Sequence, residues 1–176
     1  INIFNPVYGG YPLPTPTPLT NRVETQKAVG VFVQDQINLS DRVQLRIGAR
    51  YDDYEQTIED RAASRVSTQK EARVSPQLGL VVRAGDALSL YATYGENFRP
   101  LSGEDAQGKG FEPNQSTAAE AGMKFSLGGI DGTVALFQVR QKNILVVDDP
   151  SAFTLAAIGQ AKSQGFEVDL HGELAN

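Results

Sequence analysis

The chain has 176 residues, enough for one domain with a hydrophobic core or for part of a larger one. Its formal net charge is −5, and no segment concentrates lysine and arginine without acidic residues, so nucleic acid is not expected as a partner. Cysteine is absent, which excludes a disulfide framework, a thiolate metal site and a cysteine nucleophile.

Residues 1–21 form a turn-rich lead-in, in which proline occupies every second position from Pro12 to Pro18. Such a segment has few backbone hydrogen-bond donors and favours extended conformations. We predict a proline-rich extracellular loop or lead-in for this segment. The simplest interpretation is a plain loop or linker, and the alternative is a stiff loop that helps to shape a ligand-binding mouth.

From Arg22 onward, apolar and polar residues alternate, which is the pattern of a strand with one apolar and one polar face. In the clearest run, residues 43–52, the odd positions hold Val, Leu, Ile, Ala and Tyr, whereas the even positions hold Gln, Arg, Gly, Arg and Asp. The pattern predicts seven strands, at residues 29–39, 43–52, 72–83, 88–95, 119–127, 133–147 and 158–170.

The predicted connections alternate between short and long. Short turns are expected at 40–42, 84–87 and 128–132, and long polar connections at 57–70, 97–113 and 148–157. The turn aspartates Asp41, Asp86 and Asp131 are 45 residues apart, a spacing that fits either a propeller blade of four short strands or a hairpin of two long ones. Because each run spans about ten residues, the length that crosses a bilayer at a tilt, long hairpins are predicted.

The distribution of charge separates a membrane barrel from a soluble sheet. One face of the strands carries arginines and carboxylates, whereas the other is nearly free of charge, and no apolar run reaches the roughly 20 residues of a membrane helix. Connections that are short on one side and long on the other are typical of outer-membrane barrels. We therefore predict an all-β fold, with residues 22–176 forming an antiparallel transmembrane β-barrel segment of about seven long strands. A bacterial barrel has an even number of strands, so we expect this segment to belong to a larger barrel.

Three tyrosines near the ends of the long connections, Tyr51, Tyr54 and Tyr94, fit an aromatic girdle at the membrane surface. For each of them, an ordinary strand tyrosine is an equal alternative. The aspartate-containing turns are expected to face the periplasm, and the long connections the exterior.

Several segments, in order along the chain, resemble the barrel of TonB-dependent siderophore receptors. They are VGVFVQDQINL (29–39) with GARYD (48–52), VSPQLGL (74–80) with SLYATYGENFRP (89–100), FEP (111–113) with AEAGMK (119–124), KNIL (142–145) and SQGFEVDL (163–170). The resemblance covers roughly residues 23–174. It implies a receptor in the outer membrane of a Gram-negative bacterium that imports ferric siderophores with energy from TonB. The implied partners are the ferric siderophore, outer-membrane lipid, and TonB through a plug domain that is not visible in this chain.

Candidate ligand-contacting residues are Arg99, Tyr91 and Tyr94. Arg99 follows an aromatic residue at the outer end of a strand, and arginine pairs well with the carboxylate or hydroxamate oxygens of an anionic chelate. The two tyrosines offer flat apolar contact. The alternative for Arg99 is structural, with its guanidinium tying a loop to the barrel wall through Glu96 or Glu104.

Signals for catalysis or metal binding are weak. His171 is the only histidine, and no nucleophile motif accompanies it, so we interpret it as a solvated residue. The pairs Asp52–Asp53 and Asp148–Asp149 each supply only two carboxylates, too few for a calcium site. We therefore expect no enzyme activity, no metal site and no cofactor, with an iron(III)–siderophore chelate as the ligand. The alternatives are a porin-like outer-membrane channel and a soluble all-β binding module.

Overall fold

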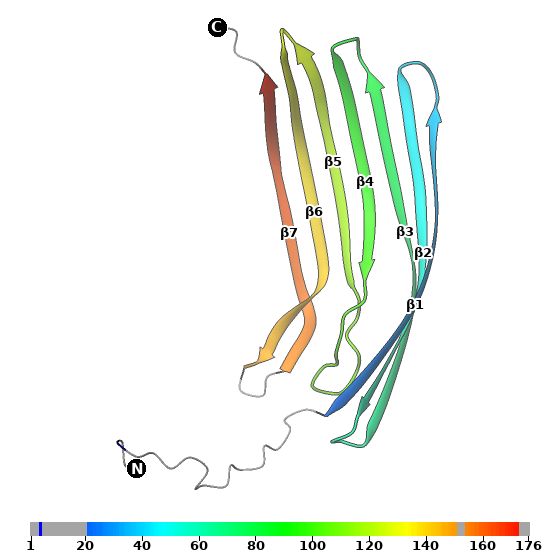
Figure 1. Ribbon diagram of the computed structural model, residues 1–176, viewed down its shortest axis with the longest axis vertical. Helices are drawn as coiled ribbons and strands as arrows, with labels where there is room; N and C mark the ends of the chain where they lie inside the picture. The colour runs from blue at the N-terminus through cyan, green and yellow to red at the C-terminus, as the bar shows by residue number, and fades with distance from the viewer. Residues whose placement is uncertain (1–3, 5–20, 151–153, 173–176) are drawn as a thin grey trace.

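The computed structural model describes Phe4, residues 21–150 and residues 154–172, so nearly all of the predicted lead-in lies outside the described residues. The rest forms one antiparallel sheet in which each strand pairs with its neighbours in the chain, in the order β1 to β7 (Figure 1). The strands are β1 Arg22–Asn38, β2 Val43–Asp60, β3 Arg65–Arg83, β4 Leu88–Arg99, β5 Asn114–Leu127, β6 Ile130–Asp149 and β7 Thr154–Gly172. The seven predicted strands are confirmed. None of the described residues forms a helix long and apolar enough to cross a membrane.

The pairing register gathers the apolar positions on one face of the sheet. Val31 lies opposite Tyr51, and Leu45 lies opposite both Ile37 and Leu80. Many of these side chains are exposed, for example Val31 at 61% and Phe166 at 74%. In water, each large apolar side chain left exposed forgoes about 1.5–3 kcal/mol of burial free energy. A whole sheet face of this kind is stable when lipid covers it, as on the outside of a transmembrane barrel.

Two of the three predicted long connections are wrong. Strands β2 and β3 stay paired as far as Asp60 opposite Arg65, which leaves a connection of only residues 61–64. In the same way, β6 continues to Asp149 and β7 begins at Thr154. The segment 57–70 is polar and yet paired: on the outward face its side chains interact across the strands, as Lys70 Nζ does with Glu55 at 2.6 Å, whereas Ile58 and Asp60 on the other face are buried.

The remaining long connection, residues 100–113, is a true loop. The pairing of β3 with β4 ends at Gln77 opposite Gly95, and the outer ends of β1, β2 and β3 extend past the end of β4 (Figure 1). The loop folds back against the polar face of these outer ends. Its Leu101 and Phe111 are buried together with Tyr54 and Ile58 of β2. The short turns all lie at the opposite end of the sheet (Figure 1).

Candidate ligand-binding mouth

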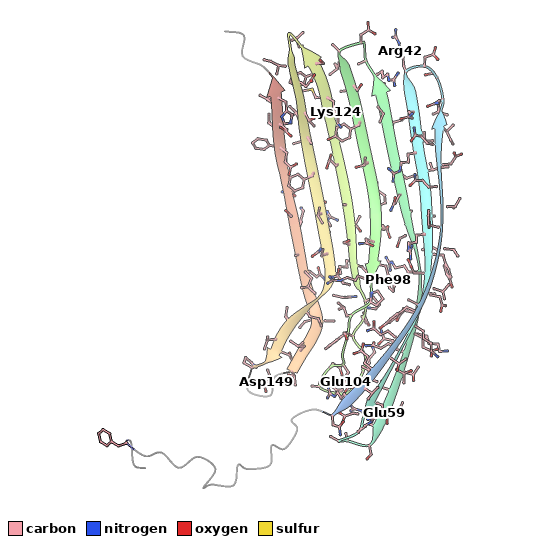
Figure 2. The ribbon with its side chains drawn as sticks, in the orientation of Figure 1. Arg42, Glu59, Phe98, Glu104, Lys124 and Asp149 are labelled. Carbon is pink, nitrogen blue, oxygen red and sulfur yellow. The ribbon has the colours of Figure 1, made fainter. Side chains whose placement is uncertain are left out.

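The 100–113 loop is anchored by a buried carboxylate. Glu104 is paired with Arg22 of β1 at 3.1 Å and with Arg65 of β3 at 2.5 Å. Its side chain is only 1% exposed, and it lies beside the outer ends of the first three strands (Figure 2). Because a buried charge is costly unless it is paired, these two arginines hold the loop in a single position.

A second carboxylate, Glu24 of β1, receives hydrogen bonds from the same loop. The Ser102 hydroxyl donates to it at 2.8 Å and the Gly103 N–H at 3.1 Å, while the side-chain amide of Gln56 donates at 2.7 Å. Burial alone raises the pKa of Glu24, but these donors, with Gln26, outweigh burial and hold the pKa below its usual value. The ionised form of Glu24 therefore stabilises the position in which the loop packs against β1.

Two glutamines complete the attachment, and both donate to loop carbonyls. Gln56 donates to the carbonyl of Leu101 at 3.3 Å, and Gln69 donates to that of Phe111 at 2.9 Å. Gln56 and Gln69 lie opposite each other, and Tyr54, two residues before Gln56 on the same face of β2, is 2% exposed. Burial, together with the charge of Glu24, raises the pKa of the Tyr54 hydroxyl to about 12. Tyr54 was a candidate for the aromatic girdle, and this assignment is wrong because the residue faces the polar side and packs beneath the loop.

The far end of the loop is held by two asparagines that bond reciprocally. The Asn114 amide donates to the carbonyl of Lys142 at 2.9 Å, and the Asn143 amide donates to that of Pro113 at 2.9 Å. Asn143 has a φ of 56°, in the left-handed region, and the pairing of β6 with β7 shifts register between Gln141 and Ile144. Asparagine is one of the residues that adopt this region readily, so Asn143 suits both the bulge and the hydrogen bond that anchors the loop.

Arg99 lies at this outer end, in a hollow of about 340 Å³. The other lining residues are amides, a hydroxyl and aliphatic side chains: Asn97, Leu101, Asn114, Ser116, Gln141, Asn143, Ile144 and Leu145. The two acids considered as partners of Arg99 are engaged elsewhere, since Glu104 pairs with Arg22 and Arg65, and Glu96 pairs with Arg73 at 3.4 Å. Within the described part of the chain, no carboxylate lies within 4.0 Å of the Arg99 guanidinium.

A larger hollow of about 600 Å³ adjoins the first and shares Asn97 and Ser116 with it. Its polar lining includes Arg46 and Gln77, which lie farther along the strands toward the short turns. Together the two hollows form a groove that leads from Arg99 along the polar face. Arg46 and the amide residues of this groove were not among the sequence-based candidates, although the strand alternation had already placed Arg46 on the polar face.

The structure does not bring the two candidate tyrosines to Arg99. Tyr91 is on the polar face, where its hydroxyl donates to Glu120 at 2.7 Å and Lys124 lies 5.8 Å from its ring, but it is eight residues, roughly 26 Å, from Arg99 along β4. Tyr94 is on the opposite face, paired with Leu78 and Ala119. Residues three apart in a strand point to opposite sides, so Tyr91 and Tyr94 do not share one surface.

The weak candidates for other chemistry are also dispersed. His171 is exposed near the short-turn end of β7 and pairs with Asp169 at 3.0 Å. Asp52 and Asp53 are consecutive strand residues and point to opposite faces, so their carboxylates do not converge on one ion. Among the described residues, no group of three or more histidine or acidic side chains is arranged to hold a metal.

Comparison with known proteins shows which family has this sequence and this arrangement of strands. Residues 1–175 match the family model described as TonB dependent receptor-like, beta-barrel. The metal-pseudopaline receptor CntO of Pseudomonas aeruginosa is 31% identical over 99% of this chain and 26% of its own length. The ferrioxamine B receptor of Salmonella typhimurium is 28% identical over all of this chain and 25% of its own length.

A solved structure gives the same result. The ferripyoverdine receptor of the Pseudomonas aeruginosa outer membrane, bound to ferripyoverdine, matches with a TM-score of 0.69 and 26% identity over 87% of this chain and 21% of that one. The chain thus spans about a quarter of the length of the curated relatives it matches. The chain belongs to the family of TonB-dependent receptors and forms part of their outer-membrane β-barrel.

Proposed function

We propose that this chain supplies part of the barrel wall and the outer mouth of a receptor that imports metal–siderophore chelates, ferric ones in particular. The relatives named above are receptors for metal-pseudopaline, ferrioxamine B and ferripyoverdine, which are metal chelates of organic ligands. The observation that carries the proposal is Arg99, a cation without a carboxylate partner among the described residues, in a hollow otherwise lined by uncharged groups. Such a site favours a ligand that brings its own negative charge.

The chemistry of the mouth is reversible binding. A guanidinium forms two parallel hydrogen bonds with a carboxylate or a hydroxamate, and each such charge-assisted bond contributes about 1.5–3 kcal/mol. Asn97 and Asn114 add amide donors and acceptors in the same hollow. The chelate then passes into the adjoining groove toward Arg46. No step forms or breaks a covalent bond, and the metal is cargo. In this proposal TonB supplies the energy, through a plug domain outside this chain.

Uptake measurements in whole cells test the proposal. The full-length gene is deleted and restored as the wild type, as Arg99→Gln or as Arg61→Gln, and uptake of radiolabelled iron is followed with hydroxamate, catecholate and carboxylate chelates. Arg61 is the control, because it lies at the tip of the β2–β3 hairpin and its guanidinium pairs with the exposed Glu59 at 3.3 Å.

We expect deletion to abolish uptake of at least one chelate. Arg99→Gln should raise the half-saturating concentration of that chelate by about tenfold or more, which corresponds to the loss of one charge-assisted contact. The Arg61 variant should behave as the wild type. Unchanged uptake of every chelate after deletion would refute the transport role, whereas equal behaviour of the two arginine variants would refute only the role of Arg99.

A further inference from the structure

A third hollow continues the groove toward the short-turn end of the sheet. It has a volume of about 500 Å³ and lies between the β1–β2 turn and the end of β3. Two residues of its lining, Gln44 and Val81, each lie two residues from a residue that lines the 600 Å³ hollow, Arg46 on β2 and Gly79 on β3. Because residues two apart in a strand point to the same face, the two hollows follow each other along the polar face.

Two arginines meet in this third hollow. Arg42 directly precedes the pair of Val43 with Val82, so it lies opposite Arg83, whose N–H donates to the Arg42 carbonyl at 2.8 Å. Both side chains are exposed, and within the described part of the chain neither has a carboxylate within 4.0 Å, although Asp41 lines the same hollow. Like charges directly opposite each other destabilise paired strands. A repulsive pair therefore lies at the short-turn end of the sheet, where Figure 2 shows Arg42.

The polar face that leads to this pair lacks acidic residues. Its positions in 44–50 of β2, 75–83 of β3 and 89–99 of β4 hold no aspartate or glutamate. Glu96 reaches the edge of the 600 Å³ hollow, but Arg73 and the Tyr94 hydroxyl engage it. The polar face of the other three strands, β5 to β7, is acidic instead, with Glu120, Asp131, Glu167 and Asp169 against Lys124 and His171. Charge is therefore sorted across the polar face, positive on β2 to β4 and negative on β5 to β7.

The unpaired arginines are spread over the height of the positive side. Arg46 is level with Thr93, which is six residues, or about 20 Å, from Arg99 along β4. Arg83 is level with Ser89, four residues or about 13 Å farther. Among the described residues, Arg46 also has no carboxylate within 4.0 Å. An anion that moves along this side thus meets a free guanidinium at the outer end, in the middle and at the short-turn end.

Building on the proposed function, we propose that Arg46 and the Arg42–Arg83 pair bind the anionic chelate in turn after it leaves Arg99, on its way to the periplasmic, short-turn end of the barrel. We call these four residues the arginine relay. A cleft lined by one sign of charge concentrates an ion of the opposite sign, and several weak sites in series let the ion leave as readily as it enters. Exposed guanidinium groups form contacts of this weak kind.

The test compares binding with transport in cells that carry the full-length receptor. The variants are Arg42→Gln with Arg83→Gln, the charge-retaining pair Arg42→Lys with Arg83→Lys, and the control Arg50→Gln, a polar-face cation of β2 that already pairs with Asp52 at 2.8 Å. The probes are two radiolabelled iron chelates, a carboxylate chelate with a net negative charge and a hydroxamate chelate with none. Binding is measured in de-energised cells and uptake in energised cells that contain equal amounts of receptor.

We expect the glutamine pair to bind the anionic chelate with wild-type affinity, because Arg99 is unchanged, but to take it up about tenfold more slowly. Uptake of the uncharged chelate should not change. The lysine pair and the Arg50 variant should behave as the wild type for both chelates.

Wild-type uptake of the anionic chelate by the glutamine pair would overturn the arginine relay and leave the proposed function intact, whereas a wild-type receptor that takes up no chelate would refute the proposed function itself. Equal slowing of both chelates, or equal slowing by the lysine and glutamine pairs, would overturn the relay, because the arginines would then support the barrel or hold a plug segment. A wild-type receptor that takes up only the uncharged chelate would also overturn it.

Discussion

Replacing Glu104 by glutamine should release the 100–113 loop without unfolding the barrel. The substitution removes the charge that pairs with Arg22 and Arg65 while keeping the size of the side chain. Breaking a fully buried ion pair costs about 3–5 kcal/mol. Because the two arginines are 42% and 40% exposed, water solvates them after the change, and we expect a smaller loss of about 2 kcal/mol.

This loss should appear as local opening. A decrease of about 2 kcal/mol in the opening free energy speeds hydrogen exchange of the loop amides by about 30-fold, whereas the amides of β4 and β5 should exchange as in the wild type. Hydrogen–deuterium exchange with mass spectrometry on the full-length receptor measures both. The control is Glu112→Gln, since Glu112 is 62% exposed and only 3.7 Å from Lys109, a surface pair of little energetic weight.

The result that would refute this reasoning is equally specific. If loop exchange in Glu104→Gln matched that in Glu112→Gln, the buried pairing would not be what holds the loop. If exchange rose throughout β1 to β5, the carboxylate would support the sheet itself and not only the loop.

Three further predictions concern pH, backbone strain and the lipid face. Because the pKa of Glu24 lies below its usual 4.5 in the folded protein, its stabilisation of the 100–113 loop is complete above pH 4.5 and is lost as the pH falls through the lowered value. Hydrogen exchange of the loop amides should rise only in that acidic range, and Glu24→Gln should remove this pH dependence. Opening of the loop between pH 5 and 7 would contradict the role given to Glu24. Asn143→Ala should destabilise the loop end by about 1 kcal/mol more than Asn143→Gly, because a φ of 56° is unfavourable for alanine and not for glycine. Equal thermal unfolding temperatures of the two variants would contradict this prediction. Leu136→Arg, on the apolar face, should cost about 2–4 kcal/mol in folding assays in lipid bilayers, whereas Gln141→Arg on the polar face should cost far less; similar values would mean that the faces are wrongly assigned.

The alternation of residues was sufficient to predict the strands and their two faces. In residues 43–52 every second side chain is apolar, and the structure pairs these residues with apolar positions on β3 and, except for Ile47 opposite Asp35, with apolar positions on β1 where β1 reaches them. The three short turns were also predicted, because glycine and aspartate interrupt the alternation there. These features depend on neighbours in the sequence, so local patterns report them.

The mouth required the tertiary structure. Glu104 is 82 residues from Arg22 and 39 from Arg65, and nothing in its local sequence indicates that the three meet. The same holds for Tyr54, which alternation allows on either a girdle or a buried surface until the loop is seen to cover it. The polar segment 57–70 was mistaken for a loop because polarity reports contact with water, whereas strand pairing depends on a partner elsewhere in the chain. Periodicity along the chain thus determined which side of each strand meets water or lipid. Only the packing of distant segments decided where the loop is anchored and that Glu96 and Glu104 pair with arginines other than Arg99.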